Sequence, residues 1–304
     1  MSSDDAARGL DAAAVAATLR RLGRAPEPPW LHQEVARRMA DRLAIIRRQP
    51  ERWIDWWGFL GAGAPAVQAQ YPKAERCVVE PTPLLRERSA ASTKRAWWSA
   101  FTAPRVTVQA EADPLPTGLQ LVWANMMLQW AADPPALFAR WLSALAVDGF
   151  VMFSCLGPGT LREMRALYAR LGWPTPTPNY VDMHDLGDML VHAGFADPVM
   201  DQEILTLRWD DAAALLADLR AWGGNTAPQR CRGLRTPRWR ARLVHALEAL
   251  RGPDGKLALG IEIAYGHAFK GAPRVGAGPT ETSVSLDDMR AMVRAGRGPH
   301  RTVS

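Results

Sequence analysis

Polar side chains that could bind a ligand stand at two points where apolar runs end. The run 118–124 ends at Asn125, which places a small amide at the edge where open α/β sheets bind their ligands. The second point is Asp55, and three glycines follow it: Gly58, Gly61 and Gly63. Glycine permits positive φ and lets a backbone approach a ligand closely. The stretch after Asp55 therefore predicts a ligand-binding turn.

Two tryptophans, Trp56 and Trp57, lie in this turn, and each is large enough to fill a binding crevice. Side chains alternate between the two faces of a strand, and helices cover both faces of a parallel sheet. We therefore expect both indoles to turn into the core and to leave the ligand edge open. An indole lying across the crevice would instead favour a protein that has lost its ligand.

The elements that must position these residues alternate between strands and helices. Apolar runs predict strands at 52–57, 76–80, 105–110, 119–124, 150–155, 198–207 and 257–265. Helical spacing and helix-end signals predict helices at 64–70, 135–146, 160–171, 185–193, 212–222 and 238–250. An earlier helix is predicted from a stripe at every fourth residue: Leu31, Val35, Met39 and Leu43. Strands separated by helices imply an α/β fold with a parallel sheet and right-handed crossovers.

Three parts are predicted along the chain. Residues 1–28 are alanine-rich and end in a proline-rich stretch, which predicts a loosely ordered N-terminal arm. Residues 29–270 are expected to form the main domain, with a helical insertion at about 210–252 between the last two strands. Residues 271–304 are rich in glycine and arginine, and they are expected to form a peripheral tail with one short helix at 287–295.

The composition indicates a globular protein without a membrane segment. Apolar residues make up 48% of the 304 residues, enough for one large core. The chain has no apolar run of about eighteen residues. Its N-terminus shows no signal-peptide pattern, so we expect a cytoplasmic protein.

The net charge is +6, and arginines cluster at 230–242 and in the tail. A basic surface favours acidic partners, although a solvated arginine-rich face is the simpler alternative. Nucleic acid is disfavoured because no recognition motif accompanies the arginines.

Cysteine and histidine form no evident reactive site. The three cysteines are far apart: Cys77, Cys155 and Cys231. We expect all three to be small buried side chains rather than a disulfide or zinc set. Three residues share a helical face at a spacing that could bind a metal, but a structural role is favoured and no metal is predicted: His184, Asp188 and His192. The segment 157–160 could form a phosphate nest, but a turn with Thr160 as helix cap is simpler.

The order of these segments resembles the class I S-adenosylmethionine-dependent methyltransferases. Within that superfamily it is most similar to the malonyl-[acyl-carrier protein] O-methyltransferases of biotin synthesis, over about residues 30–270. The segment 32–39 resembles their entry helix, 128–130 the loop after the fourth strand, and 265–270 the last strand. The resemblance implies a Rossmann-like, seven-stranded α/β sheet with helices on both faces, a helical insertion near the C-terminal strands, and S-adenosylmethionine as cofactor.

The resemblance also implies roles in cofactor binding. Glu80 matches the acid that accepts hydrogen bonds from both ribose hydroxyls, and Glu111 matches the acid beside the adenine amine. Asn125 and Met126 match the methionine end of the cofactor. Asp55 matches the acid before the glycine loop, whose glycines would be Gly58, Gly61 and Gly63.

The chain departs from the family pattern at two points. In the family three glycines follow the acid at alternate positions, whereas the glycines after Asp55 have a different spacing. In addition, Gln120 replaces the usual aspartate at the start of the fourth strand. Glycine spacing matters because positive φ is needed at particular positions of such a loop.

The function implied by the resemblance is methyl transfer from S-adenosylmethionine to the free carboxylate of a malonyl thioester on an acidic acyl carrier protein. A carboxylate is already a nucleophile, so no strong general base is needed and no catalytic residue is assigned. Arginines at 162–170 or 230–242 are candidates for the contact with the carrier. Two alternatives stay open: a catalytically degenerate binding or assembly protein, and a methyltransferase for another small molecule or RNA.

Overall fold

The computed structural model describes residues 9–93 and 104–272. The described residues up to Gly271 belong to one compact unit. The predicted C-terminal tail, with its helix at 287–295, therefore lies outside the described residues except at 271 and 272. None of the helices in the two described ranges is long and apolar enough to cross a membrane.

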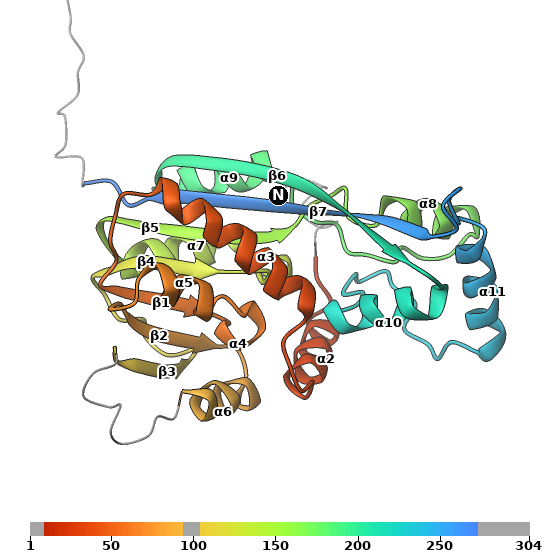
Figure 1. Ribbon diagram of the computed structural model, residues 1–304, viewed down its shortest axis with the longest axis horizontal. Helices are drawn as coiled ribbons and strands as arrows, with labels where there is room; N and C mark the ends of the chain where they lie inside the picture. Colours follow the sequence, from red (N-terminus) through yellow and green to blue (C-terminus); the bar gives the residue numbers. More distant parts are fainter. Residues whose placement is uncertain (1–8, 94–103, 273–304) are drawn as a thin grey trace, which may run out of the picture. The chain divides into compact units, whose positions relative to one another are not determined.

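Seven strands form one sheet in the order β3-β2-β1-β4-β5-β7-β6 (Figure 1). They are β1 Arg52–Trp56, β2 Glu75–Glu80, β3 Val106–Ala110, β4 Leu119–Ala124, β5 Leu145–Leu156, β6 Ala196–Trp209 and β7 Leu257–Phe269. Strands β1 to β5 run parallel, and β7 is antiparallel to both of its neighbours. The predicted seven-stranded α/β sheet is thus confirmed. The strand order reverses between β1 and β4, so a crevice is expected at their carboxyl ends.

Helices cover both faces of the sheet. On β1 the neighbours Trp53 and Ile54 belong to different core clusters, because successive side chains point to opposite faces. One cluster is completed by α3 Trp30–Asp41, α5 Ala64–Gln70, α8 Arg162–Arg170, α10 Ala212–Trp222 and α11 Pro237–Glu248. The other is completed by α4 Gly58–Gly61, α6 Pro83–Ser92, α7 Pro134–Ala144 and α9 Met183–Ala193.

The prediction of a loose N-terminal arm is wrong for residues 9–28. Helix α2 spans Ala12–Gly23 and is capped by Asp11, whose side chain accepts a hydrogen bond from the amide of Ala14 at 3.0 Å. Leu19 and Leu22 are buried in the core. The helix is stable because this apolar stripe packs against the main unit, which alanine-rich composition alone does not indicate.

Helices α10 and α11 lie between β6 and β7, where the helical insertion is predicted. The β6–β7 ladder is longer than the predicted strands and runs from Ala196 opposite Phe269 to Trp209 opposite Leu257. In Figure 1 these two strands extend past the others and reach α10 and α11. The long hairpin therefore carries the insertion to the carboxyl side of the sheet.

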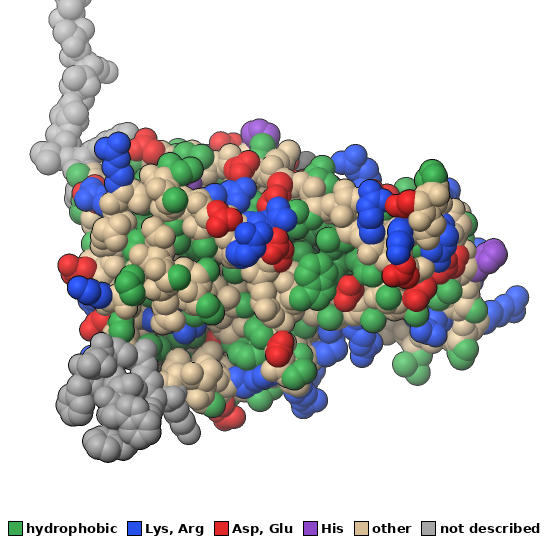
Figure 2. All heavy atoms as spheres, in the orientation of Figure 1, with side chains coloured by type: hydrophobic (Ala, Val, Ile, Leu, Met, Phe, Trp, Pro, Cys, Tyr) green, Lys and Arg blue, Asp and Glu red, His purple; other side chains and the backbone are tan. Residues whose placement is uncertain are grey.

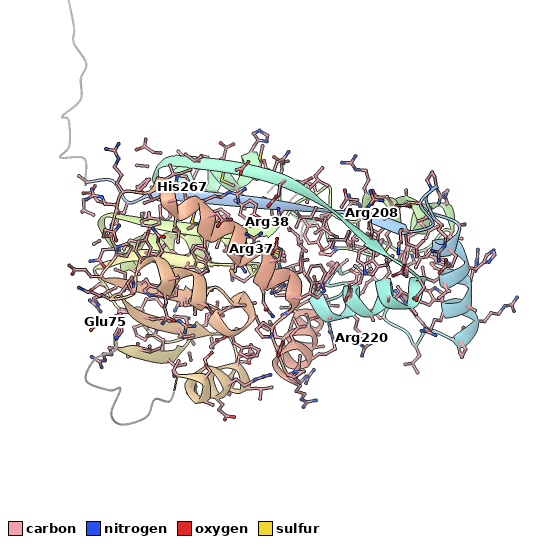
Figure 3. The ribbon with its side chains drawn as sticks, viewed as in Figure 1. Arg37, Arg38, Glu75, Arg208, Arg220 and His267 are labelled. Carbon is pink, nitrogen blue, oxygen red and sulfur yellow. The ribbon has the colours of Figure 1, made fainter. Side chains whose placement is uncertain are left out.

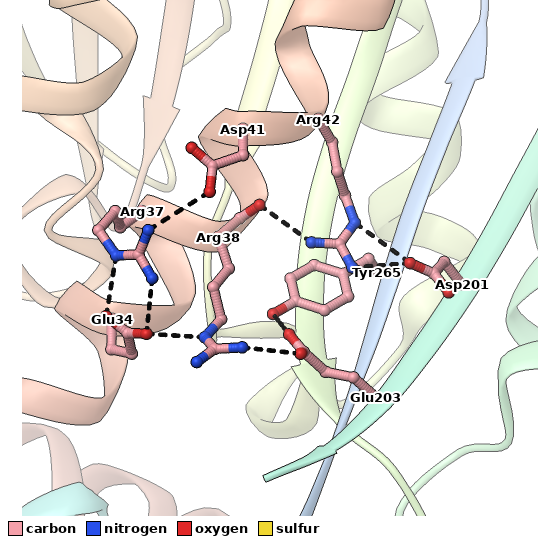
Figure 4. A network of polar contacts seen from close by, with 8 residues as sticks. All are labelled: Glu34, Arg37, Arg38, Asp41, Arg42, Asp201, Glu203 and Tyr265. Carbon is pink, nitrogen blue, oxygen red and sulfur yellow. Dashed lines mark hydrogen bonds and ion pairs between the residues drawn. The ribbon is translucent and has the colours of Figure 1, made fainter.

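A network of charged side chains fastens α3 to this hairpin (Figure 4). Arg38 of α3 donates to Glu203 of β6 at 2.9 Å, and the Tyr265 hydroxyl of β7 donates to the same carboxylate. Arg42 pairs with Asp201 at 2.7 Å and lies 3.8 Å from the centre of the Tyr265 ring. Glu203 thus accepts hydrogen bonds from both α3 and β7.

Replacing Glu203 should therefore destabilise the fold more than replacing a peripheral acid. Glu203→Ala leaves Tyr265 without its acceptor and leaves Arg38 only its ion pair with Glu34, and we expect a loss of about 1 to 3 kcal/mol in the free energy of unfolding. The matched control is Asp41→Ala, because Asp41 is 69% exposed and its ion pair with Arg37 is long, at 3.4 Å. We expect this variant to lose less than about 0.5 kcal/mol in the free energy of unfolding. Urea unfolding measures both, and equal losses would contradict the role given to Glu203.

Candidate functional site

The turn that leaves β1 is built around the buried carboxylate of Asp55. Its Oδ2 accepts hydrogen bonds from the Arg76 guanidinium of β2, with Nε at 2.9 Å. Burial raises the pKa of this carboxyl, while the charge and hydrogen bonds of Arg76 act in the opposite direction. A Cβ on Gly58 would lie 2.7 Å from the same Oδ2. Gly58 is thus required by the packing of the protein itself.

The other two glycines of the turn also face protein atoms. A Cβ on Gly63 would lie 2.1 Å from Trp123 Nε1 of β4, and a Cβ on Gly61 would lie 3.4 Å from the Asn125 carbonyl oxygen. None of the three predicted glycines has positive φ; within this turn, Trp57 and Ala62 do, at 55° and 52°. The left-handed conformations in this turn are therefore adopted by Trp57 and Ala62, and not by its glycines.

Trp57 stands at the first of the alternate positions after Asp55 at which the resembling family carries glycine. Its left-handed backbone, φ 55° and ψ 48°, costs a residue with a Cβ on the order of 1 kcal/mol. The indole Nε1 donates to Glu111 Oε2 at 2.9 Å. The ring stacks on Trp130 at 6.1 Å between centroids and 18° between planes. One side chain from the end of β1 thus contacts the segments that follow β3 and β4.

The prediction that both tryptophans turn into the core is confirmed, but they do not lie on opposite faces, because both belong to the same core cluster. Trp56 is fully buried in the core and meets Trp141 edge-on at 5.6 Å. Trp57 is also buried in this core, at 4% exposure, and its indole reaches Glu111 at the carboxyl edge of the sheet. The alternation of strand side chains ends at Trp56, and the left-handed turn at Trp57 redirects the second indole.

Glu80 ends β2 and is 1% exposed. Its Oε1 accepts hydrogen bonds from the Phe59 amide at 2.7 Å and the Ser89 hydroxyl at 2.6 Å. Its Oε2 is buried and has no hydrogen-bond partner among the described residues. Burial raises the pKa of the carboxyl to about 7, although both hydrogen bonds act in the opposite direction. One oxygen holds the turn after β1, and the other is a free acceptor.

Asn125 and Met126, predicted at the methionine end of the cofactor, lie side by side after β4. The Asn125 amide donates to the carbonyls of His32 at 2.8 Å and Gly61 at 2.6 Å, and its oxygen accepts from the Ser154 hydroxyl at 2.6 Å. These contacts use the whole buried amide within the protein. Met126 instead lines the large cavity of the molecule.

This cavity has a volume of about 710 Å³ and lies at the carboxyl side of the sheet. Its walls come from α2, α3, the segment after β4, α8, the proline loop at 176–178, and both insertion helices. Most of the lining is apolar, including Leu31, Leu161, Met164, Leu216, Leu243 and Ile261. Among the residues assigned to the cofactor from sequence, only Met126 is part of this wall.

Several polar atoms that face no protein partner belong to residues of the cavity wall. They are His32 Nε2, Thr177 Oγ1, Thr226 Oγ1 and Trp222 Nε1, all buried. His32 Nδ1 lies 2.9 Å from the Leu60 carbonyl, which can only accept, so Nδ1 carries the hydrogen. Burial lowers the pKa of His32 to about 4, and Nε2 is therefore an acceptor near neutral pH. None of these four atoms is exposed to the cavity, so a ligand would reach them only after side-chain movement.

Arginines supply the charge around this cavity. Five belong to its lining: Arg21, Arg220, Arg230, Arg235 and Arg240. Arg230 pairs with Asp11, and Arg21 donates to the carbonyls of Arg220 and Gly223, which ties α2 to the insertion. The side chain of Arg220 lies on α10 (Figure 3) and is exposed, as is that of Arg240. The rim is therefore basic while the interior is apolar.

The sequence does not predict most of this cavity, because residues 1–28 read as a loose arm and the helical insertion has no predicted contacts. The sequence does contain signals for helix α2: Asp11 is a helix-capping residue, and Val15, Leu19 and Leu22 recur at helical spacing. Of the predicted carrier-binding arginines, Arg238 and Arg242 lie on α11, and Arg242 stands over the Trp173 ring at 5.5 Å.

Among the described residues no group of three acidic, histidine or cysteine side chains could hold a metal. Two further expectations have definite outcomes. Cys77 and Cys155 are buried as predicted, but Cys231 is exposed because it lies in the loop between α10 and α11. In the segment 157–160, Thr160 donates to the Glu262 carbonyl instead of capping a helix.

The cofactor implied by the resemblance fits this chain at one end only. The unpartnered Oε2 of Glu80 is a buried acceptor of the kind that a ribose hydroxyl needs. At the adenine end the acceptor Glu111 is already bound by the Trp57 indole, and Trp57 covers the neighbouring ring of Trp130. As arranged here, the adenine end does not admit a second flat ring.

The sheet order, the antiparallel β7 and the helices on both faces define a class I methyltransferase fold. Among solved structures, the YcgJ protein from Bacillus subtilis matches with a TM-score of 0.51 and 12% identity, covering 77% of this chain and 98% of its own. A methyltransferase candidate from Bacillus halodurans also gives 0.51 at 12% identity, covering 77% and 99%. These likenesses concern the fold.

The chain belongs to the malonyl-[acyl-carrier protein] O-methyltransferase family. A protein of that name from Gallionella capsiferriformans is 38% identical over 290 residues, covering 92% of this chain and 94% of its own length. One from Laribacter hongkongensis is 38% identical over 250 residues, covering 80% and 84%. No protein-family model matches the chain.

The raised pKa of Glu80 predicts a pH-dependent stability. An acid whose pKa is raised in the folded state loses stabilisation as pH rises from its ordinary value of 4.5 towards about 7, because the unfolded chain ionises first. Relative to Glu80→Gln, the wild type should lose on the order of 2 to 3 kcal/mol across this window.

Urea unfolding between pH 4.5 and 8 measures that difference. His32, whose pKa is lowered to about 4, acts in the opposite sense in both proteins and cancels in the comparison. Parallel pH profiles for wild type and variant would show that Glu80 titrates normally in the folded protein.

Proposed function

We propose that this protein O-methylates the free carboxylate of a malonyl group carried as a thioester on an acyl carrier protein, as the names of its relatives describe. The observation that carries the proposal is the cavity of about 710 Å³ at the carboxyl side of the sheet. Sites of this size and apolar character are typical for small molecules and acyl groups. With this substrate the reaction would belong to biotin synthesis, and we expect it to take place in the cytoplasm.

The chemistry of the cavity suits an acyl group on a pantetheine arm. Such an arm is long and largely apolar, and it carries amides that need both donors and acceptors in a buried site. Four residues of the cavity wall carry buried polar atoms without protein partners, which a ligand would reach if these side chains turned towards it: His32, Thr177, Thr226 and Trp222. Buried groups without protein partners are costly, so a ligand that satisfies them gains specificity.

The basic rim suits an acidic carrier. Figure 2 shows Lys and Arg side chains interspersed with Asp and Glu over the part of the molecule that holds α10 and α11. Arg220 and Arg240 are exposed, and they come from different insertion helices on the cavity lining. Complementary charge mainly raises the rate of association and fixes orientation, which a carrier that must present its arm to a cavity requires.

The residues of this chain contribute binding, orientation and exclusion of water. A carboxylate is a competent nucleophile without proton removal, so the neutral His32 is not needed as a base. Apolar walls around the acyl group remove water and strengthen the remaining polar contacts. S-adenosylmethionine is the methyl donor that the family resemblance implies.

A second candidate function is a degenerate family member that binds the carrier without transferring a methyl group. The contact of Trp57 with Glu111 favours it, because this contact occupies an acceptor of the proposed cofactor site. The two candidates share the cavity and differ only in turnover. One assay therefore separates them.

Incubation with malonyl-carrier protein and S-adenosylmethionine should yield the methyl ester, detected as added mass on the intact carrier by mass spectrometry. The acetyl-carrier protein, which lacks the free carboxylate, is the control and should stay unchanged. Binding of the malonyl carrier without added mass would select the degenerate binding protein. Absence of both binding and added mass would reject both candidates.

Charge reversal at the cavity rim should weaken the carrier complex. In Arg220→Glu/Arg240→Glu, two exposed rim charges become repulsive to an acidic carrier, and we expect affinity to fall roughly tenfold or more at low salt. Arg47→Glu/Arg86→Glu changes the net charge equally at exposed positions outside the cavity lining and should have little effect. Titration calorimetry measures both, and equal losses would argue against docking at the rim.

A further inference from the structure

The Trp57 indole offers the same two features as an adenine ring. It is flat and aromatic, and its N–H donates to Glu111 Oε2 at 2.9 Å, where an adenine would donate from its exocyclic amine. Its face lies 18° from parallel with Trp130. A flat ring with a hydrogen-bond donor would satisfy the same carboxylate and the same aromatic face if the indole were absent.

The backbone beneath this indole is already suited to glycine. Trp57 has φ 55°, in the left-handed region that glycine adopts without steric cost. Its amide donates to the Val79 carbonyl at 2.7 Å, so the position of the backbone is fixed by the sheet and not by the side chain. A glycine at position 57 would keep the turn and empty the volume that the indole fills.

The neighbouring acceptor also points to a ligand at this edge. Glu80 Oε2 is buried and unpartnered, whereas Oε1 holds the turn through the Phe59 amide. Glu80 and Glu111 end adjacent paired strands, since the Glu111 amide donates to the Glu80 carbonyl at 2.9 Å. A nucleoside could therefore place a hydroxyl at one acid and its base at the other.

We propose that Trp57 and the adenine of the cofactor compete for one place, so that Trp57 sets the affinity of this chain for S-adenosyl ligands. The proposal rests on the proposed function for the identity of the cofactor, but not on the carrier or on turnover. Binding of S-adenosylhomocysteine requires the indole to leave Glu111 and Trp130. The tryptophan thus lowers cofactor affinity relative to a glycine at the same position.

The test is titration calorimetry of S-adenosylhomocysteine into the wild type, Trp57→Gly and Trp57→Phe. Trp57→Gly should bind at least about tenfold more tightly than the wild type, because no ring has to be displaced. Trp57→Phe keeps a ring over Trp130 and should remain weak. Equal affinities of all three folded proteins, or no binding to folded Trp57→Gly, would overturn the proposal.

A second measurement does not depend on the stability of the glycine variant. The wild type labelled with 5-fluorotryptophan gives a fluorine resonance for Trp57, assigned by its absence in Trp57→Phe. Saturating S-adenosylhomocysteine should shift this resonance, because the indole moves. Bound ligand with an unchanged Trp57 resonance would overturn the proposal, whereas the carrier and methyl-transfer experiments test the proposed function separately.

Discussion

The buried amide of Asn125 is the contact on which the site depends. It joins the His32 carbonyl of α3, the Gly61 carbonyl of α4 and the Ser154 hydroxyl of β5 at the carboxyl end of β4. An amide without these partners would be costly at 1% exposure, so the four elements hold one another in a single arrangement. The turn after β1 and the wall of the large cavity are therefore fixed by the same residue.

Two buried carboxylates, Asp55 and Glu80, hold the turn after β1 on the side of β2. Asp55 is held by Arg76, and Glu80 holds the turn through the Phe59 amide. Their pKa values are raised because burial outweighs these contacts. Charges of this kind contribute little net stability but penalise other arrangements. The turn after β1 is thus defined by acids and packing, and its glycines fit the space that remains.

Much of the fold could be predicted from sequence because buried parallel strands are continuous apolar runs. The strand at 119–124 was located to the residue, and Glu80, Glu111 and Asn125 were correctly placed at strand ends. Helix α2 was missed because small residues such as Ala14 form much of its buried stripe. The contact between Trp57 and Glu111 could not be predicted, because it needs a left-handed tryptophan, which local preference disfavours.

Trp130 relates the two halves of the site. One face of its ring stacks on Trp57, and the residue also lines the large cavity, with the His32 ring 6.0 Å away. A Cβ on Gly223 would lie 2.8 Å from the same indole, so the insertion holds Trp130 in place. Movement of Trp57 would therefore uncover a ring that is fixed from the cavity side. Asn125 and Trp130 therefore couple the turn after β1 to the wall of the large cavity, so a change in one should be felt in the other.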